Sequence, residues 1–243
     1  MHKRPRLGAR PFVHSETRGH IRSPHVACDL HGFVFVARSP VFLLSPARSD
    51  GRRAQLLLNP RAQFSLAVRL REPDGAELGE VFSFLSGLYF RGKLTYARAF
   101  VSTADAVPRI LVITADRGLA PPETRIRAED LQRFSEVDIA AGDERYIGPL
   151  TRDVATLASA LWDEDTVVLL GSIATGKYVD ALLDALGPRL LFPTDFVGRG
   201  DMSRGGLLLR SAREGRELDY IPVAGALRRG KRPPKLDRVK RGR

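Results

Sequence analysis

The stretch Thr166-Val-Val-Leu-Leu-Gly-Ser-Ile-Ala-Thr-Gly-Lys-Tyr178 decides the fold class. Its first five residues form an almost wholly apolar run, which is typical of a strand buried on both faces of a sheet. Gly171 to Gly176 then form a turn, and residues 177–186 have the pattern of a helix. A strand that leads through such a turn into a helix is the repeating unit of α/β proteins, in which crossover helices join parallel strands.

Units of the same kind extend over residues 80–223, which we predict to form one α/β domain with a mostly parallel sheet. Glycine and the pair Pro121-Pro122 oppose a helix over residues 115–124, so this segment is predicted to be a loop. The predicted helices are 85–100, 128–134, 152–162, 177–186 and 202–213. The predicted strands are 109–114, 166–170, 189–192 and 218–223.

Residues 32–75 have a different pattern, which predicts a small antiparallel β meander. Short polar breaks such as Ser39-Pro40, Ser49-Asp50-Gly51 and Asn59-Pro60 separate the apolar runs and are typical of tight connections. The strands expected here are 33–37, 41–44, 54–58 and 64–70.

The positive charge of the chain lies at its two ends. The formal net charge is +11, yet residues 1–25 hold six cations against Glu16, and residues 224–243 hold nine against Asp237. We therefore expect a basic, histidine-rich arm over residues 1–31, a folded middle, and a disordered basic tail over residues 224–243. Unopposed Lys and Arg bind nucleic acid by releasing its condensed counterions, so nucleic acid is the expected partner. A solubility tail or a contact with an acidic protein is the alternative. The residues assigned to this contact are Arg228, Arg229, Lys231 and Arg232.

The sequence indicates a cytoplasmic protein with no membrane partner. Its apolar runs are far shorter than the ~18–20 residues of a membrane span, and its first residues are polar and basic, unlike a signal peptide. The single cysteine, Cys28, excludes an internal disulfide framework.

A zinc site is the one metal centre that the sequence suggests. His14, His20, His25, Cys28 and His31 lie close together and include donors that zinc accepts. Their spacing matches no established finger, and only one thiolate is present. We therefore expect no metal and no other cofactor, with the histidines serving as surface or nucleic-acid contacts, although the zinc alternative stays open.

The loop Gly171–Lys177 has the G-x-x-x-x-G-K part of a phosphate-binding loop but has Tyr178 where magnesium binding needs Ser or Thr. Three interpretations remain: a true phosphate-binding loop, a plain strand-to-helix turn, and an anion or nucleotide site at the helix N-terminus. In the last, Gly171 and Gly176 give backbone access, Lys177 neutralises phosphate and Tyr178 stacks on a base.

The segment 195–206 is the second candidate for ligand binding. Gly198 and Gly200 allow close backbone approach, as do Gly205 and Gly206, and Arg199 and Arg204 are candidates to clamp a phosphate. Asp201 is predicted either to cap the next helix or to act as a general base.

Asp116, in the loop after the strand 109–114, has the same two interpretations, because Asp-Arg-Gly is also a turn sequence. Asp116 and Asp201 are the two candidate catalytic residues.

Thr114-Ala-Asp-Arg-Gly-Leu119, the glycine loop ending in Lys177-Tyr178, and Leu191-Phe-Pro193 with its glycine-rich sequel occur in an order that resembles the YaaA-like family. The resemblance covers about residues 81–215. Arg117 stands where that family tends to have an aromatic residue, and Arg145-Tyr146-Ile-Gly-Pro149 only loosely matches another of its motifs. The resemblance implies an α/β domain tied to DNA or to modified nucleobases, in some members as a binding protein and in others as part of a nucleobase-modifying enzyme.

The sequence thus predicts a nucleic-acid-associated protein whose α/β domain recognises a nucleobase or nucleotide, with base excision or base modification as the enzymatic form of that function. The alternatives are an enzyme that binds small-molecule nucleotides and a DNA-binding module without catalysis. Whether the protein is an enzyme is left open.

Overall fold

The computed structural model describes residues 26–28, 34–36, 39–101, 108–139, 142–174, 176–231, 233–234 and 236. The chain divides into two compact units, residues 1–37 and 38–243. In the first unit, β1 (Val26–Cys28) pairs with β2 (Val34–Val36) in an antiparallel arrangement that places Val26 opposite Val36.

The second unit is built on a six-stranded sheet in the order β10-β9-β8-β3-β5-β6. The four central strands are parallel, and the two edge strands are antiparallel to their neighbours. The α/β fold class, with a mostly parallel sheet and a short antiparallel pair before it, is therefore confirmed. The strands are β3 (Val41–Leu44), β5 (Ile110–Ile113), β6 (Leu119–Ala120), β8 (Val167–Leu170), β9 (Leu190–Pro193) and β10 (Tyr220–Pro222).

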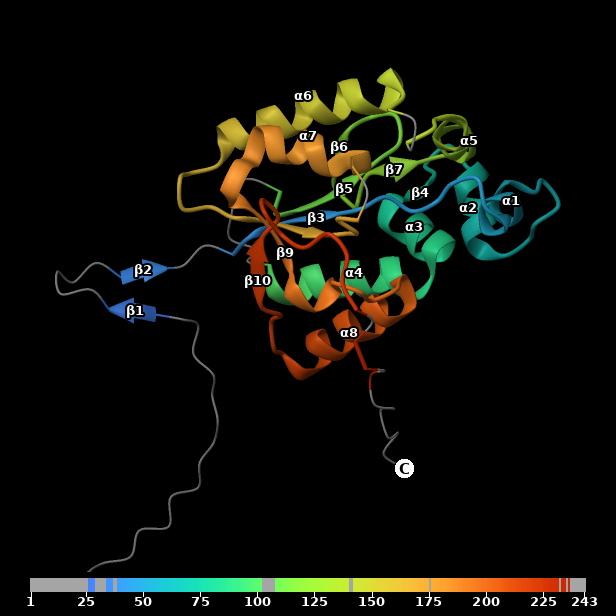
Figure 1. Ribbon diagram of the computed structural model, residues 1–243. Coiled ribbons are helices and arrows are strands. Elements are labelled where there is room, and N and C mark those ends of the chain that lie inside the picture. Colours follow the sequence, from blue (N-terminus) through green and yellow to red (C-terminus); the bar gives the residue numbers. More distant parts are fainter. Residues whose placement is uncertain are drawn as a thin grey trace, which may run out of the picture. The chain divides into compact units, whose positions relative to one another are not determined.

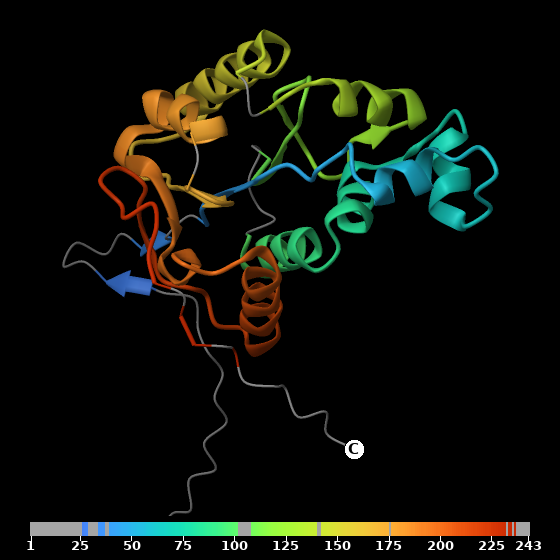
Figure 2. The same cartoon turned by 45° about the vertical axis from the view of Figure 1, so that its right-hand side comes forward.

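Helices cover both faces of this sheet (Figure 1). On one face α6 (Glu144–Ala160) packs beside α7 (Gly176–Leu186), and on the other α4 (Leu88–Phe100) packs beside α8 (Asp201–Glu214). Figure 2 shows the sheet between these two helical layers. Strands buried on both faces must be apolar throughout, and the four residues of β3 and the four of β8 are all buried.

The other four helices lie together at the right of Figure 1. They are α1 (Arg52–Leu58), α2 (Ser65–Arg71), α3 (Leu78–Ser86) and α5 (Ala128–Glu136). The strands β4 (Ala76–Glu77) and β7 (Arg125–Ile126) pair beside them, and the short 3-10 helices η1 (Gly187–Arg189) and η2 (Thr194–Phe196) flank β9. Within the described residues, no helix is both long and apolar enough to cross a membrane.

The strands predicted at 54–58 and 64–70 are wrong, because α1 and α2 occupy these residues. The buried positions are Ala54 and Leu57 in α1, and Leu66, Ala67 and Leu70 in α2. These spacings of three and four residues fit a helix, but in such short apolar runs they are hard to distinguish from the alternation of a strand. The strand predicted at 41–44 exists, but it lies at the centre of the parallel sheet rather than in an antiparallel meander.

Other predicted element boundaries also differ from those in the structure. The helix predicted at 85–100 is divided between α3 and α4 at Gly87, whose φ of +60° is a conformation that glycine adopts readily. The helix expected to begin at 152 begins at 144, where the side chain of Asp143 accepts a hydrogen bond from the backbone N–H of Arg145. The predicted loop 115–124 contains the edge strand β6.

The first part of the C-terminal tail, which the sequence predicted to be disordered, packs against the core of the second unit, to which it belongs. Ala226 and Leu236 pack against the core. Arg228 forms an ion pair with Asp180 at 3.3 Å, and Arg199 donates a hydrogen bond to the carbonyl oxygen of Pro234 at 3.4 Å.

Helices α4 and α8 approach each other so closely that their backbones touch. A Cβ atom at Gly205 would lie 2.7 Å from the carbonyl oxygen of Leu88, and one at Gly92 would lie 2.7 Å from that of Gly205. Neither backbone can yield as a flexible side chain could. Glycine at 92 and 205 is therefore a packing requirement of this helix pair.

We predict that Gly205→Ala lowers the free energy of unfolding by about 1–3 kcal/mol or more, because the added methyl group forces α8 away from α4. Gly206→Ala is the matched control, since its Cβ would meet only Leu236 Cδ1 at an ordinary 3.6 Å. Alanine's helix propensity makes the control neutral or stabilising by up to ~1 kcal/mol. Urea unfolding compares the two variants, and equal midpoints would contradict this role of Gly205.

Candidate functional site

The sheet has a topological switch point between β3 and β8. The chain passes from β3 to β5 on one side and from β8 to β9 on the other, although β3 and β8 are hydrogen-bonded neighbours. Because their connections leave in opposite directions, a crevice opens beyond their carboxyl ends, which is where α/β proteins bind ligands. Ser45 directly follows β3, and Gly171 directly follows β8.

A pocket of about 720 Å³ occupies this position, and we call it the switch-point pocket. Its volume lies within the ~300–1,000 Å³ range of small-molecule sites. It is lined by residues 45–50, by Phe82, Leu85, Ser86 and Tyr89 of α3 and α4, by Ala115, by residues 134–139, and by Ser172, Lys177, Tyr178 and Asp201.

The walls of the switch-point pocket combine aromatic rings with charged rim residues. Phe82 and Phe134 meet edge to face, with ring centroids 6.0 Å apart. Arg48 and Asp50 form an exposed ion pair with Nε and Oδ1 2.6 Å apart, and Glu136 and Asp138 also line the pocket. The arrangement suits a ligand that is partly flat and apolar and carries a few polar groups.

Ser45 is held by a buried lysine. Lys93 Nζ donates hydrogen bonds to the carbonyl oxygen of Ser45 at 2.6 Å and to Ser45 Oγ at 2.9 Å. Lys93 is only 1% exposed and does not line the pocket, whereas Ser45 lines it and is 6% exposed. Lys93 therefore lies behind Ser45 as seen from the pocket.

The surroundings of Lys93 disfavour its positive charge. Nζ lies 4.6 Å from the ring centroid of Tyr89 and 4.7 Å from that of Phe90, and within the described residues no carboxylate is at ion-pair distance. Burial lowers the pKa of Lys93 to about 7, a shift opposed by Asp201 and assisted by Arg204. Near neutral pH the charged and the neutral form of this side chain are therefore both populated.

Two tyrosines complete the inner end of the pocket. The Tyr178 hydroxyl donates to the carbonyl oxygen of Ser172 at 2.8 Å, and burial raises the pKa of Tyr178 to about 12. The Tyr89 hydroxyl is buried and has no hydrogen-bond partner in the part of the chain that the structure describes. A buried hydroxyl of this kind is a candidate ligand contact.

The structure brings Lys177 and Tyr178 to the switch-point pocket, whereas Gly171 packs behind them and does not line it. A Cβ at Gly171 would lie 2.7 Å from the Tyr178 hydroxyl and 2.8 Å from Ser45 Cβ, so glycine there permits packing inside the protein. Tyr178 is 5% exposed, and its buried ring is therefore not presented for base stacking as predicted. Gly176 is the first residue of α7 and is exposed. Lys177 is half-buried, lines the pocket and has no ion-pair partner among the described residues.

The predicted phosphate clamp at Arg199 and Arg204 is not free. Arg199 donates to the carbonyl oxygen of Asp195 at 2.9 Å, and its side chain is 10% exposed. Arg204 donates twice to the carbonyl oxygen of Phe196 and lies over its ring. Both guanidinium groups are thus used to hold η2 against α8.

The glycines of the same segment also have structural roles. Gly198 has a φ of +72°, and the backbone at Lys231 lies against it. Gly200 is the N-cap of α8. Neither residue lines the switch-point pocket.

The two candidate catalytic aspartates lie apart. Asp116 forms ion pairs with Arg117 at 3.1 Å and Arg133 at 3.3 Å, which secure α5, and it does not line the pocket. Asp201 does line the pocket, as the first residue of α8, and bonds Arg204 at 3.4 Å with its side chain 68% exposed. Asp201 is therefore the one of the two that a ligand can reach.

The remaining predicted positions lie at the ends of the chain. Arg228, Arg229 and Lys231 are exposed, whereas Arg232 lies outside the described residues. The proposed zinc ligands also fall outside the described residues: His14, His20, His25, His31 and the side chain of Cys28. A zinc site therefore remains an alternative prediction from the sequence. Among the described residues no group of three metal-binding side chains occurs.

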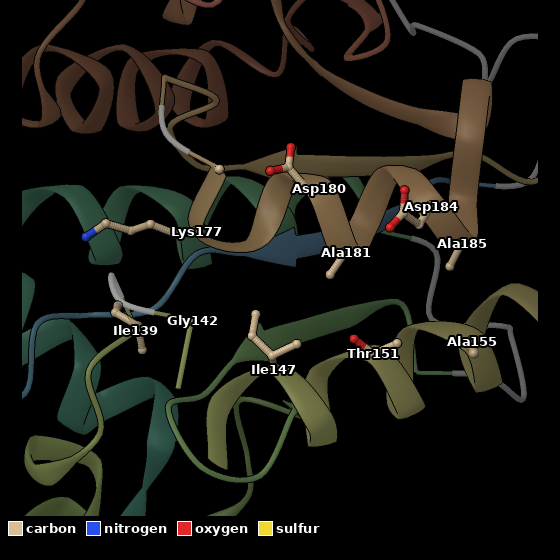
Figure 3. A pocket seen from close by; sticks show the side chains of 11 residues that line it. Ile139, Gly142, Ile147, Thr151, Ala155, Lys177, Asp180, Ala181, Asp184 and Ala185 are labelled. Atoms are coloured by element: carbon tan, nitrogen blue, oxygen red, sulfur yellow. The ribbon is translucent and has the colours of Figure 1, made fainter. Parts of the chain in front are cut away.

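A second hollow of about 810 Å³ lies between α6 and α7 (Figure 3). Ile147, Thr151 and Ala155 of α6 face Ala181 and Ala185 of α7, with Asp180 and Asp184 on the rim. Ile139 and Lys177 line both hollows. Its walls consist mostly of small apolar side chains, which offer few polar contacts to a ligand.

Comparisons with protein-family models, with curated proteins and with solved structures find no match to this chain. The relationship to the YaaA-like family therefore stays a prediction.

Sequence reasoning missed Ser45, Tyr89 and Lys93. A signal for Lys93 was present, because it stands among the apolar positions Tyr89, Phe90, Leu94 and Ala97 of a helix, where a lysine is expected to be costly. Its pairing with Ser45, 48 residues earlier, depends on tertiary structure.

The lowered pKa of Lys93 predicts a pH-dependent stability. Lys93→Met keeps an unbranched side chain, one atom shorter than lysine, and removes the titratable group. Between pH 7 and 10 the unfolded wild type holds a proton on Lys93 that the folded state has released. The wild type should therefore gain stability relative to Lys93→Met as the pH rises, by at most about 1.4 kcal/mol per pH unit. Urea unfolding from pH 6 to 10 measures this difference, and one that stays constant would contradict a neutral Lys93.

Proposed function

We propose that this protein is nucleic-acid-associated and recognises a nucleobase or nucleotide in the switch-point pocket. The observation that carries the proposal is the location of an aromatic-lined pocket at the carboxyl ends of β3 and β8. Doubly wound α/β folds use this location for nucleotides and related cofactors. The resemblance of the sequence to the YaaA-like family, which implies a nucleobase-related function, also supports this proposal.

The apolar walls suit the base. Phe82, Tyr89 and Phe134 line the pocket but are only 1%, 6% and 2% exposed, so a planar base contacts the small exposed part of each ring within an apolar wall. Asp201 and Asp138 line the same pocket, and carboxylates accept hydrogen bonds from the exocyclic amino groups of bases.

Lys177 suits a phosphate group. It lines the pocket at the first turn of α7, where the backbone N–H groups of a helix also favour an anion. Since Lys177 has no ion-pair partner in the described part of the chain, a phosphate does not have to displace a carboxylate. This contact replaces the clamp that Arg199 and Arg204 were predicted to form.

Thermal-shift screening of nucleosides and nucleoside monophosphates tests the proposal. We expect at least one monophosphate to raise the melting temperature. Lys177→Ala should weaken its binding about fivefold, as one exposed charge contact of ~1 kcal/mol requires, without changing the binding of the matching nucleoside. Arg61→Ala, which removes an exposed charge in the loop between α1 and α2, is the control. If no nucleoside or nucleotide stabilises the wild type, the pocket has another ligand.

The basic tail supplies the affinity for nucleic acid in this proposal. Because residues 226–236 include packed positions, the sharper variant replaces only Arg238, Lys240, Arg241 and Arg243 with glutamine. We expect this variant to bind a labelled duplex more weakly and with a less steep dependence on salt. The slope should fall by up to about 0.9 for each phosphate that the tail no longer neutralises. Fluorescence anisotropy between 50 and 200 mM salt measures both effects. Binding equal to that of the wild type would exclude the end of the tail as the contact.

A further inference from the structure

We propose that Ser45 and Lys93 form a nucleophile and base pair that hydrolyses an ester or thioester in the switch-point pocket. The inference uses the same pocket as the proposed function but not the identity of its ligand. It concerns two residues joined across the fold, one from the end of the central strand and one from α4.

The geometry of the pair is that of an activated serine. A nucleophile and its base are expected within about 2.6–3.2 Å, and Ser45 Oγ lies 2.9 Å from Lys93 Nζ. Serine and lysine form such a pair in known variants of the catalytic triad. Ser45 lines the pocket and Lys93 does not, so a substrate meets the hydroxyl while the amine stays out of water.

A third group orients the base. The carbonyl oxygen of Ser45 accepts a hydrogen bond from Lys93 Nζ at 2.6 Å, and the rings of Tyr89 and Phe90 lie beside Nζ. The charged groups that face Lys93 are Asp201 and Arg204 of α8, which act on it in opposite senses. Burial dominates and lowers the pKa of Lys93 to about 7, so a neutral amine is available to accept the serine proton.

The reaction balances with water as the only co-substrate. Neutral Lys93 takes the proton of the Ser45 hydroxyl as Oγ bonds to the carbonyl carbon of the substrate. The bond from that carbon to the leaving oxygen or sulfur then breaks, and the leaving group takes the proton from Lys93. In the second half, Lys93 takes a proton from water, the hydroxide attacks the acyl carbon, and Ser45 regains its proton as the acid leaves. Lys177 supplies positive charge in the same pocket while the carbonyl oxygen is negative.

A biotinylated fluorophosphonate tests the pair in the full chain, without knowledge of the natural substrate. Ser45 Oγ bonds to phosphorus, fluoride leaves, and Lys93 takes the proton. We expect one label per chain, found by mass spectrometry on the peptide that contains Ser45. Ser45→Ala should lose the label, and Lys93→Met should react at least about 100-fold more slowly. Ser159→Ala, an exposed serine of α6, should react like the wild type.

The pH profile of the wild type keeps the test decisive if Lys93→Met does not fold. Labelling should rise with pH and level off above about 7, following the neutral fraction of Lys93, whereas attack without this base would keep rising about tenfold per pH unit. An unlabelled Ser45, wild-type labelling of folded Lys93→Met, or a rate without a plateau would each overturn the proposal. Failure of every nucleoside to bind, with Ser45 labelled as expected, would reject only the nucleobase function.

Discussion

The backbone contact between α4 and α8 at Gly92 and Gly205 is the constraint on which the inner end of the pocket depends. It brings two helices from distant parts of the chain to a separation that only glycine allows. Tyr89 and Lys93 lie on α4 within one turn of Gly92, and Asp201 and Arg204 lie on α8 within about a turn of Gly205. A wider separation of the helices would let water reach Lys93 and restore its ordinary charge.

The sheet topology supplies the other half of the site. β3 lies between β5 and β8, and the connections from β3 to β5 and from β8 to β9 lead away from each other. The carboxyl end of β3 is therefore left uncovered, and Ser45, the next residue, lies at the opening of the crevice. Burial of a lysine without a carboxylate partner lowers the stability of the folded protein. Methionine or leucine would fill the same space without this cost if the position had only a structural role. The fold retains the amine where it contacts the one serine at the end of the central strand.

The sequence was informative where local patterns coincide with the final environment. The apolar runs that became β5, β8 and β9 are buried on both faces, so their composition alone predicted them. The runs that became α1 and α2 are too short for their period to decide between helix and strand. Lys177 and Tyr178 lie at the start of the helix that follows β8, where the sequence predicted a helix, and they line the switch-point pocket. The contact between Ser45 and Lys93 joins residues 48 positions apart and has no local signature.

The charged and glycine-rich segment 195–206 shows why residue type alone overstates a ligand site. Its arginines donate to nearby carbonyl oxygens, and Gly205 admits a helix rather than a ligand. A guanidinium group has several N–H donors, which bond to the closest acceptors whether or not a ligand is present. A glycine allows close approach of any neighbouring group, protein or ligand, because it has no Cβ. A better indication of a functional group is a buried polar atom without a hydrogen-bond partner, or a buried ionisable group whose burial lowers stability. Lys93, buried without a carboxylate, and the hydroxyls of Tyr89 and Tyr146, buried without a hydrogen-bond partner, meet that criterion among the described residues. Of these, Tyr89 lines the switch-point pocket and Lys93 contacts Ser45, which also lines it.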